Sequence, residues 1–341
     1  MAEDRKISGF SSSRRNLLVG LATAPVLAAP MAASAAADFE SAFATASAQV
    51  QAELEGAKGT KLVLLGTGGG PVPGQTRHMT SHLMLHDGAA YILDCGMGVT
   101  DQFARTGTPF NAVRAIFITH HHFDHNIEYG PFLLVGWSRG LLRSVCAYGP
   151  PPLRQMTQDL LRAYQATINF WAEDFKLPPF GMIDVHDLPT AGPVMHDDHV
   201  KVTSVLVQHP PVTPAYGYRF DFPDRSIAFS GDTVPLEAVA QLARGADVLV
   251  HEAIDMATME NLIRRAIAQG SPANFENQMH HMRVDHTPTE DVGRIAQDAG
   301  VKTLVLSHLS PSTNVSDEAW HGPAAKYFKG RIVIGHDLMV I

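Results

Sequence analysis

A short run of the sequence concentrates side chains that bind metal ions. The sequence His-His-His-Phe-Asp-His occupies residues 120–125 and follows an apolar, strand-like segment. In an extended chain His120 and His122 point to the same side, so both can bind one ion. Asp124 and His125 follow in the turn and can bind a second ion. Imidazole and carboxylate suit zinc, and two zinc ions about 3.5–4 Å apart can activate water for hydrolysis. A solvated, metal-scavenging tract is the alternative, and the core-like residues before the run disfavour it.

The elements that must position this run are those of an α/β chain. Short apolar runs alternate with helical patterns and are separated by Gly and Pro. Strands are predicted at 61–65, 81–85, 91–93, 115–119, 145–148, 200–207, 216–221, 226–230, 248–251, 303–307 and 332–335. Helices are predicted near 152–172, 235–243, 256–268 and 289–299. The tight turn between 216–221 and 226–230 indicates antiparallel pairing, so two helix-covered sheets fit better than one purely parallel sheet.

The composition limits the classes of protein. With 341 residues, 45% hydrophobic and 18% charged, the chain can bury a large core. Eighteen histidines favour metal chemistry. The net charge of −8 repels phosphate backbones, so we expect a small-molecule substrate and no nucleic-acid partner. Two cysteines, Cys95 and Cys146, exclude a disulfide framework and leave one bridge or two thiols open.

The pattern His-X-His-X-Asp-His resembles the signature of the metallo-β-lactamase superfamily, and the resemblance extends along nearly all of residues 61–341. It implies an αββα sandwich of two mixed β-sheets flanked by helices. In that family a further His binds the first ion, an Asp bridges both ions, and a last His completes the second site. The matching residues here are His209, Asp232 and His308, each at the end of a predicted strand. Taken singly, each could be a structural residue, but their order and placement favour ligands.

The resemblance therefore implies two Zn²⁺ ions, with iron or manganese open because the ligand types overlap. The implied ligands are His120, His122, Asp124, His125, His209, Asp232 and His308. Asp124 would also steer the attacking water.

Two further segments look like the branch that holds tRNase Z and the arylsulfatases of this fold. The first is Leu-Gly-Thr-Gly-Gly-Gly at residues 65–70, whose glycines either serve a turn or cradle a phosphate. The second is Leu-Asp-Cys-Gly at residues 93–96. The resemblance implies that Asp94 orients a ligand imidazole by a hydrogen bond, and a turn cap is the alternative.

A proton donor is implied by two other segments. Val-His-Glu-Ala at residues 250–253 and His-Thr-Pro-Thr at residues 286–289 are similar to segments of tRNase Z. There a histidine protonates the leaving oxygen and a glutamate orients it, which implies His286 as the acid and Glu252 as its partner. Alternatively, His286 is a bystander beside a helix capped by Thr287 or Asp285.

The substrate class is inferred from departures from tRNase Z. Between His125 and His209 there is no long arm rich in Gly and Lys, but an aromatic stretch with Phe170, Trp171 and Phe175. Those rings form either an apolar wall for an aryl group or part of the core. The run Val-Gly-Arg-Ile-Ala at residues 292–296, which leads to residues 301–309, is similar to exported arylsulfatase-like members of the family. This resemblance implies arylsulfatase-like hydrolysis of sulfate esters. A phosphodiesterase, a lactonase and a β-lactamase-like hydrolase are the enzymatic alternatives, and a periplasmic metal-binding protein is the non-enzymatic one.

The N-terminus resembles a twin-arginine signal peptide. Arg14 and Arg15 precede an apolar run over 17–29, which is shorter than the ~20 residues that span a membrane, and small residues precede Asp38. We therefore expect export to the periplasm or the medium, with no membrane contact after cleavage. The expected domains are a signal peptide at 1–37, a helical lead-in at 38–60 and a catalytic domain at 61–341. The sequence leaves open whether the protein forms a homodimer.

Overall fold

The computed structural model describes residue 45 and residues 47–341, apart from residues 56–57, 73–74, 182 and 314. The expected signal peptide at 1–37 lies outside the described residues. In the expected lead-in, residues 47–54 are helical. The described residues belong to one compact unit. Among the described helices, none combines the length and the apolar character that crossing a membrane requires.

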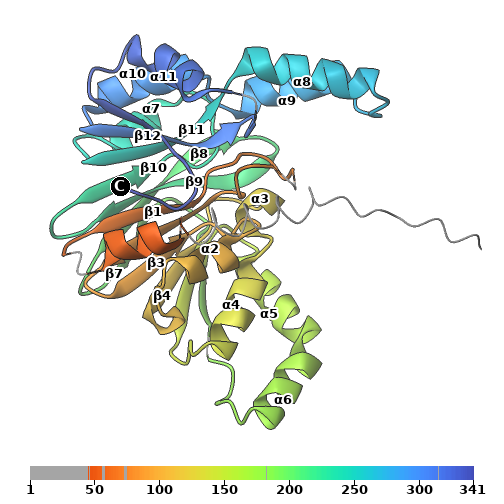
Figure 1. The fold of residues 1–341 in the computed structure, drawn as a ribbon, viewed down its shortest axis with the longest axis vertical. Helices are drawn as coiled ribbons and strands as arrows, with labels where there is room; N and C mark the ends of the chain where they lie inside the picture. The colour runs from red at the N-terminus through yellow and green to blue at the C-terminus, as the bar shows by residue number, and fades with distance from the viewer. Residues whose placement is uncertain (1–44, 46, 56–57, 73–74, 182, 314) are drawn as a thin grey trace, which may run out of the picture. The chain divides into compact units, whose positions relative to one another are not determined.

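Two seven-stranded sheets form the centre of this unit (Figure 1). The first has the order β14-β1-β2-β3-β4-β5-β6 and the second the order β13-β12-β11-β10-β9-β8-β7. The strands of the first sheet are β1 (Lys61–Gly66), β2 (Ser81–His86), β3 (Ala89–Leu93), β4 (Val113–Phe117), β5 (Val145–Gly149), β6 (Ile183–Asp187) and β14 (Met339–Val340). Those of the second are β7 (Gly192–His196), β8 (Lys201–His209), β9 (Val212–Asp221), β10 (Ser226–Phe229), β11 (Val248–Ile254), β12 (Thr303–Ser310) and β13 (Arg331–Ile334).

Both sheets are mixed. From β14 to β3 the first sheet is antiparallel, and from β3 to β6 it is parallel. The second is antiparallel from β7 to β10 and parallel from β10 to β13. Strands β8, β10, β11 and β12 therefore run in the same direction, and their carboxyl ends meet at one edge of the sheet.

Helices cover the outer face of each sheet (Figure 1). The helices are α2 (Val99–Arg105), α3 (Phe123–Asn126), α4 (Tyr129–Ser138), α5 (Leu153–Ala163), α6 (Gln165–Asp174), α7 (Glu237–Leu242), α8 (Met256–Ala268), α9 (Phe275–Asp285), α10 (Thr289–Ala299) and α11 (Asp317–Ala325), with a 3₁₀ turn at Phe110–Ala112. Helices α2, α4 and α5 pack on the first sheet, and α7, α10 and α11 on the second.

Three apolar layers hold these elements together. Phe103 of α2 and Phe132 of α4 are buried against the outer face of the first sheet. Phe117 and Tyr218 belong to the layer between the sheets, with ring centroids 5.7 Å apart. Trp320 of α11 is buried on the outer face of the second sheet. The fold is the αββα sandwich that the sequence predicts, because each sheet buries apolar side chains on both faces.

Some elements differ from the sequence-based prediction. The helices predicted at 256–268 and 289–299 have those bounds, but the one predicted at 152–172 is two helices, α5 and α6. Strands β6 and β7 were not predicted. Both are edge strands with few fully buried residues, so they lack the apolar alternation by which strands are predicted.

Candidate metal centre

The predicted ligands come from the carboxyl ends of strands in both sheets. His120 follows β4, and Asp124 and His125 lie in the short helix α3. From the second sheet, His209 ends β8 and Asp232 follows β10. His308 lies near the end of β12 and is buried. The structure therefore brings together all seven residues that the sequence analysis proposed, and the burial of most of them rules out a solvated tract.

Three imidazoles form the first group of potential ligands. His120 Nε2 and His209 Nε2 each lie 3.1 Å from His122 Nδ1. The three nitrogens are within 4.8 Å of one another. Burial lowers the pKa of His120 well below its ordinary value, so this ring is neutral and has a lone pair for a cation.

The second group combines two imidazoles with two carboxylates. His308 Nε2 lies 3.2 Å from Asp124 Oδ2 and 3.1 Å from Asp232 Oδ2. His125 Nε2 lies 3.6 Å from Asp124 Oδ2 and 3.3 Å from Asp232 Oδ2. Asp232 Oδ2 is also 3.8 Å from both His120 Nε2 and His209 Nε2. One carboxylate therefore faces both groups, as a bridging ligand must.

Unsatisfied polar atoms test whether these residues fit a pair of cations. Among the described residues, His125 Nε2 and Asp232 Oδ1 are buried without a hydrogen-bond partner. Burial lowers the pKa of His125, but Asp232 and the other nearby carboxylates raise it well above its ordinary value. A cation replaces such protons when it binds, and buried polar atoms without a hydrogen bond need another partner. The donor set of imidazole and carboxylate therefore fits a binuclear metal centre.

Neighbouring groups fix the orientation of the ligand rings. Asp94 Oδ2 accepts a hydrogen bond from His125 Nδ1 at 2.8 Å, which leaves Nε2 facing the centre. Asp94 Oδ1 in turn accepts from the Thr119 backbone N–H at 2.8 Å. His209 Nδ1 donates to the Asp285 carbonyl at 2.9 Å. Asp94 thus has the geometry that the resemblance implied, since such bonds set the tautomer of a ligand imidazole.

The Gly-rich loop lies against two ligands. The Gly70 backbone N–H donates to Asp124 Oδ2 at 2.9 Å. A Cβ atom on Gly69 would lie 2.7 Å from His308 Nδ1, so only glycine fits there. Gly70 has a φ of 83°, which requires glycine for a different reason. The loop therefore positions ligands besides forming a turn.

The predicted acid and its partner are hydrogen-bonded and buried. His286 Nδ1 donates to Glu252 Oε2 at 2.9 Å, because a carboxylate can only accept. Glu252 Oε1 accepts from the Thr233 backbone N–H at 2.7 Å. Burial lowers the pKa of His286, but Glu252 more than offsets it, so the net pKa is raised. Neither Asp285 nor Thr287 caps α10, whose N-cap is Pro288, so the alternative in which one of them caps this helix is wrong.

The ring of His286, the predicted acid, lies directly beside two of the predicted metal ligands. The His286 ring is 5.2 Å from the His209 ring and 5.7 Å from the His308 ring. Its Nε2 remains free of the bond to Glu252, so it can face a bound substrate.

A cleft of about 950 Å³ opens over the centre. It lies between the Gly-rich loop, α3 and the helical hairpin formed by α8 and α9. Phe123 and Arg265, neither of which was predicted as a functional residue, both line this cleft. Phe123 could have been noticed, because it is an aromatic residue between two metal ligands, whereas no sequence signal distinguishes Arg265.

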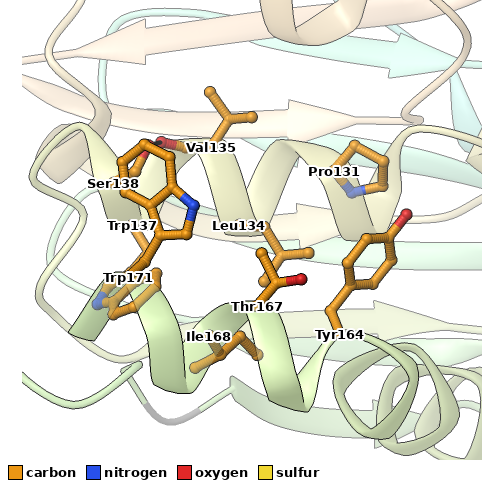
Figure 2. Close-up of a pocket in the computed structure, with 9 residues that line it drawn as sticks. All are labelled: Pro131, Leu134, Val135, Trp137, Ser138, Tyr164, Thr167, Ile168 and Trp171. Atoms are coloured by element: carbon orange, nitrogen blue, oxygen red, sulfur yellow. Dashed lines mark hydrogen bonds between the residues drawn. The ribbon is translucent and has the colours of Figure 1, made fainter. Parts of the chain in front are cut away.

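The aromatic stretch of α6 does not line the cleft. Phe170 and Phe175 are exposed. Trp171 instead lines a separate pocket of about 260 Å³ between α4 and α6, together with Trp137 and Tyr164 (Figure 2). These rings therefore form neither a wall beside the metal centre nor part of the core.

Comparisons with known proteins agree with this fold and site. The family model described as Beta-lactamase superfamily domain matches residues 90–309. The chain belongs to the metallo-β-lactamase superfamily, whose fold and site define a metal-dependent hydrolase. Ribonuclease Z of Mycobacterium bovis is 33% identical over 285 residues, which cover 82% of this chain and 96% of that protein. Ribonuclease Z of Mycobacterium marinum is 32% identical, with the same coverage.

Solved structures with low sequence identity share the fold. Human tRNase Z, short form, superposes with a TM-score of 0.59 at 20% identity, covering 82% of this chain and 98% of that one. The metallo-β-lactamase fold protein YhfI from Bacillus subtilis has a TM-score of 0.61 at 18% identity, covering 83% and 98%.

These relatives correct two expectations. Arylsulfatase-like hydrolysis of sulfate esters is wrong, because the similar curated proteins are ribonucleases. The expectation of a small-molecule substrate and no nucleic acid is contradicted by the same names. The ligands could not decide the first point, since an activated water attacks sulfur and phosphorus centres alike. The net charge wrongly suggested that the chain binds no nucleic acid, because it averages over the whole surface and does not count cations that the site would hold.

Proposed function

We propose that the chain is a zinc-dependent phosphodiesterase that cleaves RNA, as the name ribonuclease Z states for its relatives. The observation that carries this proposal is the carboxylate of Asp232, which faces both ligand groups, with a buried histidine–glutamate pair beside them. Similarity to ribonuclease Z over 96% of that protein supports RNA as the substrate.

The two ligand groups divide the work of holding the cations. His120, His122 and His209 would hold the first, and Asp124, His125 and His308 the second, with Asp232 shared. When bound, a pair of zinc ions supplies a nucleophilic water at neutral pH and stabilises negative charge on the phosphoryl oxygens. Zinc fits because all seven donors are imidazole or carboxylate groups.

The protein's own groups complete the reaction. Expulsion of a ribose oxygen at neutral pH requires a proton, and His286 Nε2 is positioned to supply it. Glu252 holds the ring through Nδ1 and keeps its pKa above the ordinary value. Asp124, whose Oδ2 accepts a hydrogen bond from the Gly70 N–H, would also orient the attacking water.

The test is a substrate comparison on zinc-loaded protein. We expect hydrolysis of bis(p-nitrophenyl) phosphate and endonucleolytic cleavage of a precursor transfer RNA, and little hydrolysis of the monoester p-nitrophenyl phosphate. Absence of diester hydrolysis by protein that holds two zinc ions would overturn the proposal. Hydrolysis of the small diester without RNA cleavage would overturn RNA as the substrate.

A further inference from the structure

We infer that the cleft between α3 and the α8–α9 hairpin is a nucleotide subsite in which Phe123 stacks on a base and Arg265 contacts a flanking phosphate. This inference rests on the proposed function, because it takes the substrate to be RNA. It goes beyond that function by assigning substrate recognition to residues outside the metal centre and the acid pair.

Phe123 has an unusual environment for a large apolar side chain. It is 69% exposed, although the adjacent Asp124 is 3% exposed. It is the first residue of α3, directly after His122, and it lines the cleft. Its neighbours His122 and Asp124 face the metal centre, so the backbone of Phe123 lies beside that centre. Exposed rings of this kind stack on the faces of unpaired bases, which sequence-tolerant RNA-binding proteins exploit.

The hairpin provides the opposite wall of the cleft. Met259, Leu262, Ile263 and Ala266 recur at helical spacing and place one face of α8 toward the cleft. Met282 of α9 lies on the same side. A space with a ring on one wall and flexible apolar side chains on the other suits a flat, apolar ligand.

Polar groups at the cleft match the edge of a base. Gln75 lines the cleft, and its Oε1 is a buried acceptor without a hydrogen-bond partner among the described residues. Asn277 and Gln278 of α9 are exposed amides on the opposite side. Amide side chains pair with the donors and acceptors of base edges. A purely aliphatic ligand would leave the Gln75 acceptor unsatisfied, so a nucleobase is the better occupant.

Arg265 of α8 brings a positive charge to the cleft, whose lining also includes the metal-centre carboxylates Asp124 and Asp232. Arg265 is the one arginine or lysine among the described residues that line it. The neighbouring Arg264 has a different environment, since it pairs with Glu260 at 2.7 Å and lies 4.0 Å from the centroid of the Phe275 ring. Arg264 is therefore a matched control of the same residue type on the same helix.

Binding can be measured separately from catalysis with a short oligoribonucleotide that carries one 2-aminopurine. The protein is the zinc-loaded full chain with His286→Asn, which slows cleavage during the measurement. We expect binding to quench the fluorescence, because stacking quenches this base. Phe123→Ala should remove the quenching and weaken binding about 10-fold, as expected for loss of one base–aromatic stack, whereas Phe123→Tyr should preserve both.

The arginine pair tests the phosphate contact. Arg265→Ala should weaken binding severalfold and reduce its salt dependence, and Arg264→Ala should leave both unchanged. Zinc content and melting temperature, measured for every variant, show whether the fold and the metal centre are intact.

Three results would overturn the inference. The first is that the oligoribonucleotide does not bind, and the second is that quenching persists in Phe123→Ala. The third is that Arg264→Ala and Arg265→Ala weaken binding equally. The outcomes separate this inference from the proposed function. If quenching depends on Phe123 but the chain with native His286 cleaves no RNA, the nucleotide subsite is supported and the proposed function is wrong. If an otherwise wild-type chain with Phe123→Ala cleaves RNA with unchanged kcat/KM, the proposed function is supported and the nucleotide subsite is wrong.

Discussion

At the scale of single residues, Asp232 connects the two halves of the metal centre. Its Oδ2 lies 3.1 Å from His308 Nε2 and 3.3 Å from His125 Nε2, and it faces the first group as well. We expect Asp232→Ala to lose at least one of two zinc ions, because the shared ligand is removed. Elemental analysis after gel filtration measures this loss. Asp101→Ala, an exposed carboxylate paired with Arg105, should keep both ions.

His286 should behave differently, because it is proposed to move a proton and not to hold metal. We expect His286→Asn to lower kcat on a phosphodiester by about 10²–10⁴-fold, the usual contribution of general acid catalysis, with two zinc ions still bound. Steady-state kinetics and metal analysis on the same sample check this. The exposed His280 on α9 is the control, and His280→Asn should match the parent. Zinc loss from the His286 variant would instead make it a ligand.

At the scale of elements, the loop after β1 controls a ligand that is distant in sequence. The space that a Cβ atom on Gly69 would need is filled by the His308 ring and by Ser310 Oγ. We expect Gly69→Ala to displace His308 and weaken binding of one zinc ion. Competition with a fluorescent chelator measures this affinity. Gly322→Ala in α11, where a Cβ would meet nothing within 4 Å, should leave zinc affinity unchanged.

At the scale of the whole molecule, the metal centre joins the two sheets. Removal of the cations leaves buried imidazoles and carboxylates from β4, β8, β10 and β12 facing one another without a shared partner. A ligand at 100 times its Kd stabilises the folded state by about 2.7 kcal/mol. We therefore expect EDTA to lower the melting temperature by several degrees, measured by circular dichroism. An Asp232→Ala chain should show a smaller drop, and equal melting with and without EDTA would contradict the structural role of the ions.

Export by the twin-arginine route stays a prediction, since residues 1–37 lie outside the described residues. Fusion of this segment to a folded reporter tests it. We expect the reporter in the periplasm when the segment keeps Arg14 and Arg15. We expect it in the cytoplasm when both are changed to lysine. Export of the lysine variant would show that the pair is not the signal.

The strands and the first metal ligands were accessible from the sequence because their signals are local, whereas His209, Asp232 and His308 were implied by the resemblance to the metallo-β-lactamase superfamily. His120 and His122 share a side through the two-residue period of extended chain, and apolar runs mark the strands that precede His209, Asp232 and His308. Edge strands β6 and β7 lack such runs, so they were missed.

The sequence by itself therefore determined two helix-covered sheets and the metal-binding run at residues 120–125, and its family resemblance implied the remaining ligands. Only the tertiary structure decided which groups approach from far along the chain: Gly69 against His308, Glu252 beneath His286, and Phe123 opposite the α8–α9 hairpin. Such approaches depend on how sheets and helices pack, and packing brings together residues whose separation in sequence carries no periodic signal.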